Sequence, residues 1–283
     1  MYSKLKNFLI ETSHDFPYLL KSTYSKKKKL TLLLNYLRFY LVFLIRRDKE
    51  KEGSVKIFGF IIEYINFEAL LFMFREIFIR NSYYFYSSKK TPIIYDCGAN
   101  IGVSVIYFKW LYPDCVIHAF EPNIYAFKIL KNNIKKNKFK DIHLYNLALL
   151  DVKTRVNLYI DLKNKGMLSN SLLRDRLPND KIKVDTYPLS TLIGTYDIDL
   201  LKMDIEGLEE KVMREVIKTN KINQVNEMII EYHKDIKNNK STLSDFLKLF
   251  EEADFVYRLD VSAIPLYWKD LYQDILIYLR RHE

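Results

Sequence analysis

Cysteine is scarce in this sequence: Cys97 and Cys115 are the two present among 283 residues, and each lies within an apolar run. So few thiols exclude a small secreted fold held together by disulfides, and they favour a reducing cellular interior. The Cys and His spacing of a four-ligand zinc site is also missing. We therefore expect a cytoplasmic protein whose fold depends on its hydrophobic core.

Long hydrophobic runs are missing as well. The apolar-rich stretch at residues 30–45 is 16 residues long and is interrupted by Asn35 and Arg38. A membrane-spanning helix needs about 20 apolar residues. The stretch also lies too far from Met1 for a signal peptide, and no small-residue cleavage site follows it. We expect neither a spanning helix nor a cleaved leader.

Positive charge is concentrated in the N-terminal third. Residues 1–90 contain 17 Lys and Arg against 8 Asp and Glu, whereas residues 91–283 contain 28 against 27. Residues 26–47 are therefore either an amphipathic helix that contacts an anionic membrane at its inner face, or a helix that packs on the domain with a solvated basic end. Nucleic-acid binding is not expected, because no RNP, helix-turn-helix or KH pattern accompanies the charge.

The chain divides into three segments by pattern. Residues 1–54 form a basic helical extension, residues 55–91 a cap strand and helix, and residues 92–283 the main domain. The main domain alternates strand and helix patterns, which predicts an α/β fold with a mainly parallel sheet. The expected strands are 93–96, 115–120, 142–147, 197–207, 226–233, 255–259 and 274–280, and the expected helices are 103–111, 123–137, 208–218 and 241–252. Residues 161–183 are polar and turn-rich, and we interpret them as a substrate-facing loop.

The stretch IIYDCGANIGVSV places two glycines and an acid directly after the first expected strand. A dinucleotide fingerprint needs G-x-G-x-x-G, whereas here Asn100 takes the middle position between Gly98 and Gly102. Asn tolerates left-handed backbone best after glycine, so a tight turn remains possible. Asp96 would repel a pyrophosphate and suits a cationic cofactor without phosphate, S-adenosyl-L-methionine. The residues thus favour a methyl donor over NAD, with a plain strand–helix turn as the alternative.

Glu121 ends the second expected strand, 19 residues after Gly102. A carboxylate at this place can accept hydrogen bonds from both hydroxyls of a ribose, and NAD sites share this feature. Glu121 therefore supports a nucleoside cofactor without deciding which one. The alternative interpretation is an acid at a helix start, just before Pro122.

Four segments, DCGANIG, AFEPN, LLKMDIEGLE and IIEYH, occur in an order and spacing that resembles the FkbM family of S-adenosylmethionine-dependent methyltransferases. The resemblance covers about residues 55–260, so the first 50 residues fall outside it. It implies a class I methyltransferase, Rossmann-like fold with helices on both faces of a seven-stranded sheet. The implied strand order is 3-2-1-4-5-7-6, with the last strand antiparallel.

The resemblance also implies roles for individual residues. Glu121 holds the ribose, and residues 146–151 are where we expect the adenine. Members of the family are mostly O-methyltransferases, and several of them act on sugars, polyketides or related small molecules. Four residues of the glycine turn are implied to line the methionine end of the cofactor: Asp96, Gly98, Asn100 and Gly102.

The acceptor side is expected after the fourth strand. Lys202, Asp204 and Glu206 share a face by strand alternation. Three ionisable groups there need pairing if they are buried, and pairing of Lys202 with either acid is the structural interpretation. In the functional interpretation Asp204 orients or deprotonates an acceptor hydroxyl, while Lys202 lies beside it in the catalytic site.

His233 and Glu231 end the fifth expected strand and share a face. His233 is the one histidine at the carboxyl end of an expected strand, which makes it a candidate general base, with a surface histidine as the alternative. A Mg²⁺ site of Asp204, Glu206 and Glu231 is a further hypothesis, because three carboxylates suit this ion.

The sequence thus predicts an S-adenosylmethionine-dependent O-methyltransferase that acts on a hydroxyl of a sugar, surface glycan or related small molecule. Two alternatives remain: a non-catalytic, cofactor-binding protein docked on a membrane, and an NAD-dependent oxidoreductase.

Overall fold

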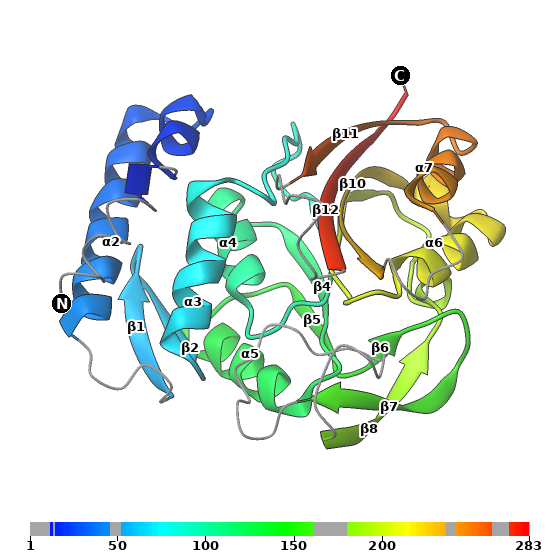
Figure 1. Cartoon of the computed structure of the whole chain (residues 1–283), viewed down its shortest axis with the longest axis horizontal. Coiled ribbons are helices and arrows are strands. Elements are labelled where there is room, and N and C mark those ends of the chain that lie inside the picture. The colour runs from blue at the N-terminus through cyan, green and yellow to red at the C-terminus, as the bar shows by residue number, and fades with distance from the viewer. Residues whose placement is uncertain are drawn as a thin grey trace.

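The computed structural model describes residues 12–13, 15–45, 52–160, 180–235, 242–261 and 272–282. At its centre lies a sheet of seven strands in the order β11-β12-β10-β9-β3-β4-β5 (Figure 1). Read along the chain, this is the order 3-2-1-4-5-7-6, and β12 is antiparallel to both of its neighbours. The expected class I methyltransferase arrangement is therefore confirmed. The strands are β3 (Ile93–Cys97), β4 (Val116–Phe120), β5 (Ile142–Tyr145), β9 (Ile198–Met203), β10 (Val225–Asp235), β11 (Phe255–Val261) and β12 (Tyr272–Arg281).

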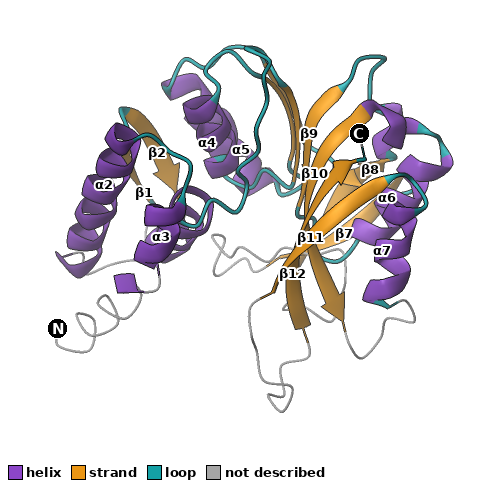
Figure 2. Cartoon of the chain, turned by 90° about the horizontal axis from the view of Figure 1, so that it is seen from above, coloured by secondary structure: helices purple, strands orange, loops and turns teal. Residues whose placement is uncertain are grey.

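Helices cover both faces of this sheet (Figure 2). One hydrophobic cluster joins the sheet to α4 (Val103–Leu111) and α5 (Ile124–Lys136). A second cluster joins it to α6 (Glu209–Lys218) and α7 (Leu243–Glu251). Strand β9 lies between these two clusters. All six of its residues are buried, as expected for a strand whose two faces are both covered by helices.

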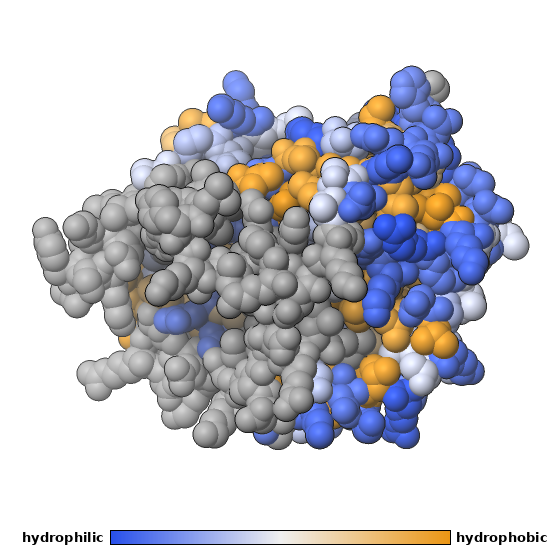
Figure 3. Space-filling model, turned by 45° about the vertical axis from the view of Figure 1, so that its right-hand side comes forward, coloured by the Kyte–Doolittle hydropathy of each residue, from blue (hydrophilic) through white to orange (hydrophobic). Residues whose placement is uncertain are grey.

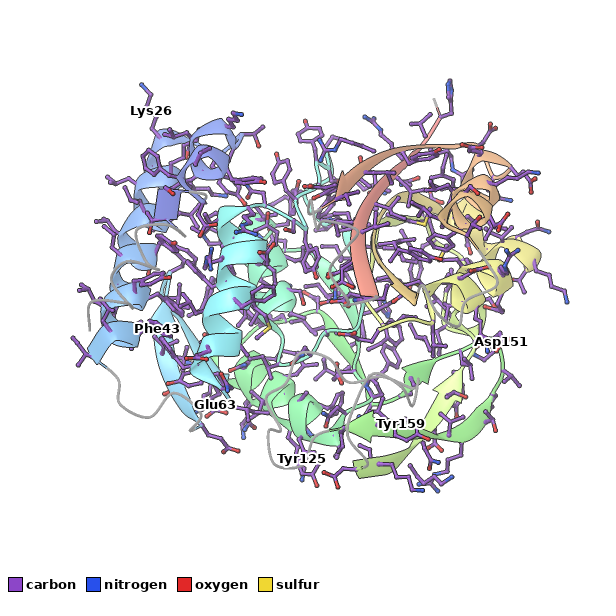
Figure 4. The ribbon with its side chains drawn as sticks, in the orientation of Figure 1. Lys26, Phe43, Glu63, Tyr125, Asp151 and Tyr159 are labelled. Atoms are coloured by element: carbon purple, nitrogen blue, oxygen red, sulfur yellow. The ribbon has the colours of Figure 1, made fainter. Side chains whose placement is uncertain are left out.

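The N-terminal segment packs on the α4 side of the sheet. It contains α2 (Lys26–Ile45), a hairpin of β1 (Gly53–Ile57) and β2 (Phe60–Tyr64), and α3 (Phe67–Phe74), which continues into a π-helix at Arg75–Ile79. The expected single cap strand is therefore a two-stranded hairpin. Figure 4 shows Glu63 of β2 on the side facing α5, where it pairs with a lysine of that helix.

Helix α2 confirms the packing interpretation for one of its faces. Leu32, Tyr36, Phe39 and Tyr40 are buried in the same cluster as α4, and the ring of Phe39 stacks on Phe74 at 4.7 Å. In the part of the chain that the structure describes, no helix combines the length and apolarity needed to cross a membrane. The division of the chain into three segments stays a prediction. One continuous hydrophobic core joins the N-terminal helices to the sheet, so the core does not mark a boundary between these segments.

A small second sheet flanks the carboxyl end of β5. It consists of β6 (Ala148–Leu149), β7 (Thr154–Ile160) and β8 (Asp180–Tyr187) in the order β6-β8-β7. Residues 161–179 of the expected substrate loop lie outside the described residues, and residues 180–183 are a correction, because they begin β8. Their exposed and part-buried side chains alternate, and their polar composition hid this strand pattern.

Short 3₁₀ turns complete the described structure, at Leu189–Thr191 and Lys221–Gln224. Tyr125 of α5 packs against the cluster that β6, β7 and β8 form, and Figure 4 labels it together with Tyr159 of β7. On the face shown in Figure 3, the coloured side chains are mainly hydrophilic, with hydrophobic side chains in patches between them.

Candidate active site

Two pockets meet at the carboxyl ends of the central strands. The smaller has an empty volume of about 620 Å³ and the larger about 1400 Å³. Both are lined by Gly98, Asn100, Asp204 and Glu206. In an open α/β sheet, ligands bind at this edge where the strand order reverses. The shared residues come from the loops after β3 and β9, the two strands at that reversal.

The glycine turn after β3 depends on close backbone packing. Gly98 has φ +86°, and a Cβ added there would lie 1.8 Å from the carbonyl oxygen of Asp204. Gly102 has φ +88°, and a Cβ there would lie 2.5 Å from Cδ1 of Leu130. Gly98 therefore allows the turn to reach β9, whereas Gly102 allows α4 to begin against α5. Gly102 is not among the described residues that line either pocket.

Asp96 takes a different place from the one expected. Its side chain is fully buried, accepts a hydrogen bond from Ser104 Oγ at 2.5 Å and lies 3.3 Å from Lys202 Nζ. It does not belong to the described walls of the two pockets. This is a correction: Asp96 lies beneath the turn and fixes Lys202 and the start of α4. Sequence alternation gave the strand face but not the depth of the side chain.

Glu121 lines the smaller pocket as a buried carboxylate. The backbone N–H groups of Asn100 and Asn123 donate to its two oxygens, at 2.9 and 2.7 Å. Burial raises the pKa of Glu121 to about 7, although these two donors lower it. Its free lone pairs remain available to ribose hydroxyls. The side chain that caps α5 belongs to Asn123, which weighs against a capping role for Glu121.

The rest of the smaller pocket is largely apolar. Phe120, Leu147, Leu149 and Leu158 form its inner wall. Leu147 and Leu149 come from the region where the adenine was expected, whereas Leu158 comes from β7, which no sequence signal connected with the site. Its described lining contains three carboxylates, Glu121 among them, and no Lys or Arg. An apolar wall beside acidic groups fits the adenosine and the cationic sulfonium of S-adenosylmethionine, and it is unfavourable for a pyrophosphate.

Lys202 is held among acceptors at the border of the larger pocket. Its side chain is 2% exposed, donates to the carbonyl of Gly98 at 2.7 Å, and lies 3.7 Å from Asp204 Oδ2. Burial alone would lower the pKa of Lys202, but the carboxylates of Asp96 and Asp204 outweigh it and raise the pKa. The expected pairing is therefore present, and Lys202 is a fixed positive charge.

The larger pocket is strongly acidic. Its cationic side chains are Arg80 and Lys202. The hydroxyl of Tyr83 lies 3.4 Å from Asp204 Oδ2 and 3.5 Å from Glu231 Oε2, so its one proton can be donated to either acid. Six carboxylates line the pocket: Glu76, Asp204, Glu206, Glu231, Asp260 and Asp274.

His233 is buried behind this acidic wall. Its Nδ1 donates to Glu209 Oε1 at 3.0 Å, and its Nε2 lies 3.7 Å from both Asp204 and Glu206. Burial lowers the pKa of His233, but the surrounding carboxylates raise it well above the usual value. His233 is not among the described residues that line either pocket, and its Nε2 faces two carboxylates, so the geometry argues against His233 as the general base. Burial, and then Asp204, raise the pKa of Glu231 to about 8.

The residues that the structure brings together as a possible metal site differ from the three carboxylates named from the sequence. Among the described residues, ligand atoms of Asp204 and Glu206 gather with His233, whereas Glu231 gathers with His233 and Asp274. The three carboxylates named from the sequence do not form one group. Asp274 stands opposite His233 in the register of β10 and β12, a pairing that cannot be read from the sequence.

Several site residues had no sequence signal. Arg80 and Tyr83 come from the segment before β3, and Asp274 comes from β12. Glu209 does belong to the motif after β9, and its Oε1 also accepts the N–H groups of Ile205 and Gly207.

Comparison with known proteins gives one family. The family model described as "Methyltransferase FkbM domain" matches residues 96–257, more than half of the chain. "Methyltransferase 1" of Beauveria bassiana (strain ARSEF 2860) is 26% identical over 163 residues, which span 50% of this chain and 66% of that protein. The "31-O-demethyl-FK506 methyltransferase FkbM" of Streptomyces tacrolimicus is 25% identical over 186 residues, 55% of this chain and 72% of that protein. The chain thus spans about two thirds of these relatives.

A solved structure is similar over most of the chain. It is described as methyltransferase FkbM from Methylobacillus flagellatus KT, with a TM-score of 0.48 and 14% identity. The match covers 96% of this chain and 60% of that one.

Proposed function

Because this chain belongs to the FkbM family, and is therefore an S-adenosylmethionine-dependent methyltransferase, we propose that it methylates a hydroxyl group of a sugar, glycan or related small molecule. The observation that carries the proposal is the position of Asp204, which lines both pockets and contacts Tyr83 and Lys202. An acceptor in the larger pocket would meet a carboxylate at the border of the cofactor pocket.

The smaller pocket is the proposed cofactor site. Glu121 would accept the ribose hydroxyls, and Phe120 and Leu149 would contact the adenine. Gly98 and Asn100 would face the methionine end. When bound, S-adenosylmethionine supplies an electrophilic methyl group on a positively charged sulfonium. The border carboxylates, Asp204 among them, offset that charge.

Asp204 is the proposed proton acceptor. A sugar hydroxyl is a weak acid, so its proton has to leave as its oxygen forms the new bond to carbon. Asp204 takes this proton, while Tyr83 and Lys202 hold its Oδ2 side. Alignment of the acceptor oxygen supplies much of the remaining rate acceleration. The relative whose name describes 31-O-demethyl-FK506 supports oxygen as the methylated atom.

The charge of the larger pocket favours a class of acceptor. In the described lining, six carboxylates against Arg80 and Lys202 repel phosphate groups, attract amines and can accept hydrogen bonds from neutral polyols. A neutral, polyhydroxylated sugar or glycan therefore fits better than a nucleotide sugar. The acidic lining of the smaller pocket likewise counts against the NAD-dependent oxidoreductase.

A panel of acceptors tests this function. The purified protein is incubated with radiolabelled methyl donor and with neutral glycans, amino sugars, polyketide alcohols and nucleotide sugars. We expect label in a base-stable ether of an uncharged hydroxylated compound, and loss of that label in Asp204→Asn. Methylation of nitrogen or carbon, preference for phosphorylated acceptors, or full activity of Asp204→Asn would contradict the proposal. Binding of S-adenosylmethionine without label in any compound would favour the non-catalytic alternative.

For location, we propose the cytoplasmic side of an anionic membrane, with peripheral contact through residues 26–47. Lys26, Lys27 and Arg38 are exposed on α2 next to an apolar stripe. Spacing of three or four residues puts the stripe on one face of the helix, as in interfacial helices. Its exposed fractions are 58% for Leu30, Leu34 and Leu41, 39% for Leu37 and 78% for Ile45.

Liposome co-sedimentation tests this contact. We expect binding to vesicles that contain phosphatidylserine, reduced by Leu34→Ser combined with Leu41→Ser, and weak binding to neutral vesicles. Equal sedimentation of both forms would refute membrane contact, and a concentration-dependent dimer in ultracentrifugation would assign the stripe to a second copy.

A further inference from the structure

We propose that Asp204, Glu206 and His233 form a site for one divalent cation of the Mn²⁺ type, at the border between the two pockets. One ligand atom from each of these residues lies within 4.8 Å of the others. The role of the cation in catalysis rests on the proposed function, whereas the binding itself can be measured without any acceptor.

The orientation of His233 is the first argument. Its side chain is 4% exposed, and its Nδ1 donates to Glu209 at 3.0 Å, which fixes the ring. Nε2 then faces Asp204 Oδ1 and Glu206 Oε2, and no hydrogen bond to Nε2 is present among the described residues. A buried imidazole whose other nitrogen donates to a carboxylate is the usual arrangement of a histidine that binds a metal.

The distances are the second argument. Nε2 lies 3.7 Å from each of the two carboxylate oxygens, which is too long for a hydrogen bond. Divalent cations hold nitrogen and oxygen ligands at about 2.0–2.2 Å, so two ligands of one ion lie up to about 4.4 Å apart. The two separations from Nε2 fit around one ion, and the three ligand atoms all lie within 4.8 Å of one another. Glu231, whose Oε1 lies 4.0 Å from Nε2, gathers with His233 and Asp274 instead and is not one of the three ligands.

Local charge is the third argument. Several carboxylates converge on Nε2, whereas Lys202, a cation of the same pocket, is already held by Asp96 and by the carbonyl of Gly98. The ion would take the place of the Nε2 proton of His233 and neutralise Asp204 and Glu206 directly. One imidazole with carboxylates suits Mn²⁺ and related first-row ions better than Mg²⁺, which prefers oxygen ligands alone.

The location gives the cation a role. Asp204 and Glu206 line both pockets, so the ion would lie where the acceptor meets the cofactor. There it would bind the acceptor hydroxyl and lower its pKa. Oδ1 of Asp204 faces the ion, whereas Oδ2, which Tyr83 and Lys202 hold, has a second lone pair that would take the hydroxyl proton. Acceptors with two adjacent hydroxyls would be favoured, because both can bind one ion.

Manganese titration of the full chain tests the site. After dialysis against EDTA, free Mn²⁺ is followed by electron paramagnetic resonance as protein is added. We expect one Mn²⁺ per chain, bound more tightly than Mg²⁺, with affinity at least about tenfold weaker in Glu206→Gln and in His233→Asn. Asp260→Asn is the matched control, since Asp260 lines the larger pocket outside this group, and its affinity should equal that of the wild type.

Three results would overturn the site: no stoichiometric binding of Mn²⁺ to the wild type, wild-type affinity in both variants, or tighter binding of Mg²⁺ than of Mn²⁺. Circular dichroism establishes that each variant is folded, and Glu206→Gln keeps the test valid if His233→Asn unfolds, because Glu206 lies in a partly exposed loop. Binding of Mn²⁺ without methylation of any hydroxyl would refute the proposed function and leave the metal site intact.

Discussion

The backbone N–H of Asn100 donates to Oε2 of Glu121 at 2.9 Å, and this contact joins the glycine turn after β3 to the end of β4. Asn100 can make it because its backbone is left-handed, with φ +47°. The carboxylate is thereby oriented before any ligand binds. A turn and an acid separated by 21 positions thus act as one element of the cofactor pocket.

The raised pKa of Glu121 predicts a pH-dependent cofactor affinity. Its pKa is about 7, and the ionised carboxylate is the better acceptor for ribose hydroxyls. Affinity for S-adenosylmethionine should therefore rise from pH 6 to pH 8, by up to about tenfold per unit below the pKa. Glu121→Gln should bind about tenfold or more weakly at pH 8, since hydrogen bonds to a charged group contribute about 1.5–3 kcal/mol. Isothermal titration measures both effects, and a parallel pH profile in the variant would exclude Glu121 as their source.

The raised pKa of Glu121 also predicts the direction in which the free energy of unfolding changes with pH. Because the folded protein binds a proton at Glu121 more tightly than the unfolded chain does, stability falls as pH rises from about 4.5 to about 7. Glu121→Gln removes this dependence. The difference in free energy of unfolding between Glu121→Gln and the wild type should therefore shift in favour of the variant from pH 5 to pH 8. Urea denaturation at both pH values measures this difference.

Gly98 and Gly59 form a matched pair for testing the turn. Both have positive φ, +86° and +89°, but a Cβ at Gly59 meets nothing within 4 Å, whereas at Gly98 it would lie 1.8 Å from the backbone of Asp204. Gly59→Ala should cost about 1–2 kcal/mol of strain. Gly98→Ala should cost more and abolish cofactor binding, because the turn has to move away from β9. Similar melting temperatures for the two variants would contradict this account of the turn.

Much of the fold could be predicted from the sequence, because apolar periodicity marks buried strands and helices such as β9 and α4. The positions of Asp204 and Glu121 at strand ends also followed from the sequence. The arrival of Tyr83 beside Asp204 did not, because it depends on packing between segments 121 positions apart. The burial of Asp96 could not be predicted either. The alternation of side chains along a strand shows on which face a residue lies, but not which segments cover that face. The orientation of the His233 ring depends on Glu209, which lies on a different element.

Tyr83 should affect turnover more than cofactor binding. Burial, and then the nearby carboxylates, raise the pKa of Tyr83 well above its usual value, so its hydroxyl remains a donor toward Asp204 and Glu231. Tyr83→Phe should lower kcat by about tenfold to a hundredfold, the range expected for a lost hydrogen bond to a carboxylate. The dissociation constant for S-adenosylmethionine should stay unchanged. Tyr86→Phe, at a site 73% exposed, is the control, and equal kcat values for the two variants would remove Tyr83 from the mechanism.

Lys202 should be indispensable for stability as well as for the site. Lys202→Met leaves Asp96 buried without its cation, and breaking a buried pair in this way costs about 3–5 kcal/mol. Asp96→Asn combined with Lys202→Met should recover part of that loss, because no unpaired charge remains. Lys89→Met supplies the comparison: Lys89 pairs with Asp199 but is 50% exposed, and an exposed pair contributes about 0.2–1 kcal/mol. Urea denaturation compares the three variants with the wild type, and a loss for Lys202→Met no larger than that for Lys89→Met would show that Asp96 does not depend on Lys202.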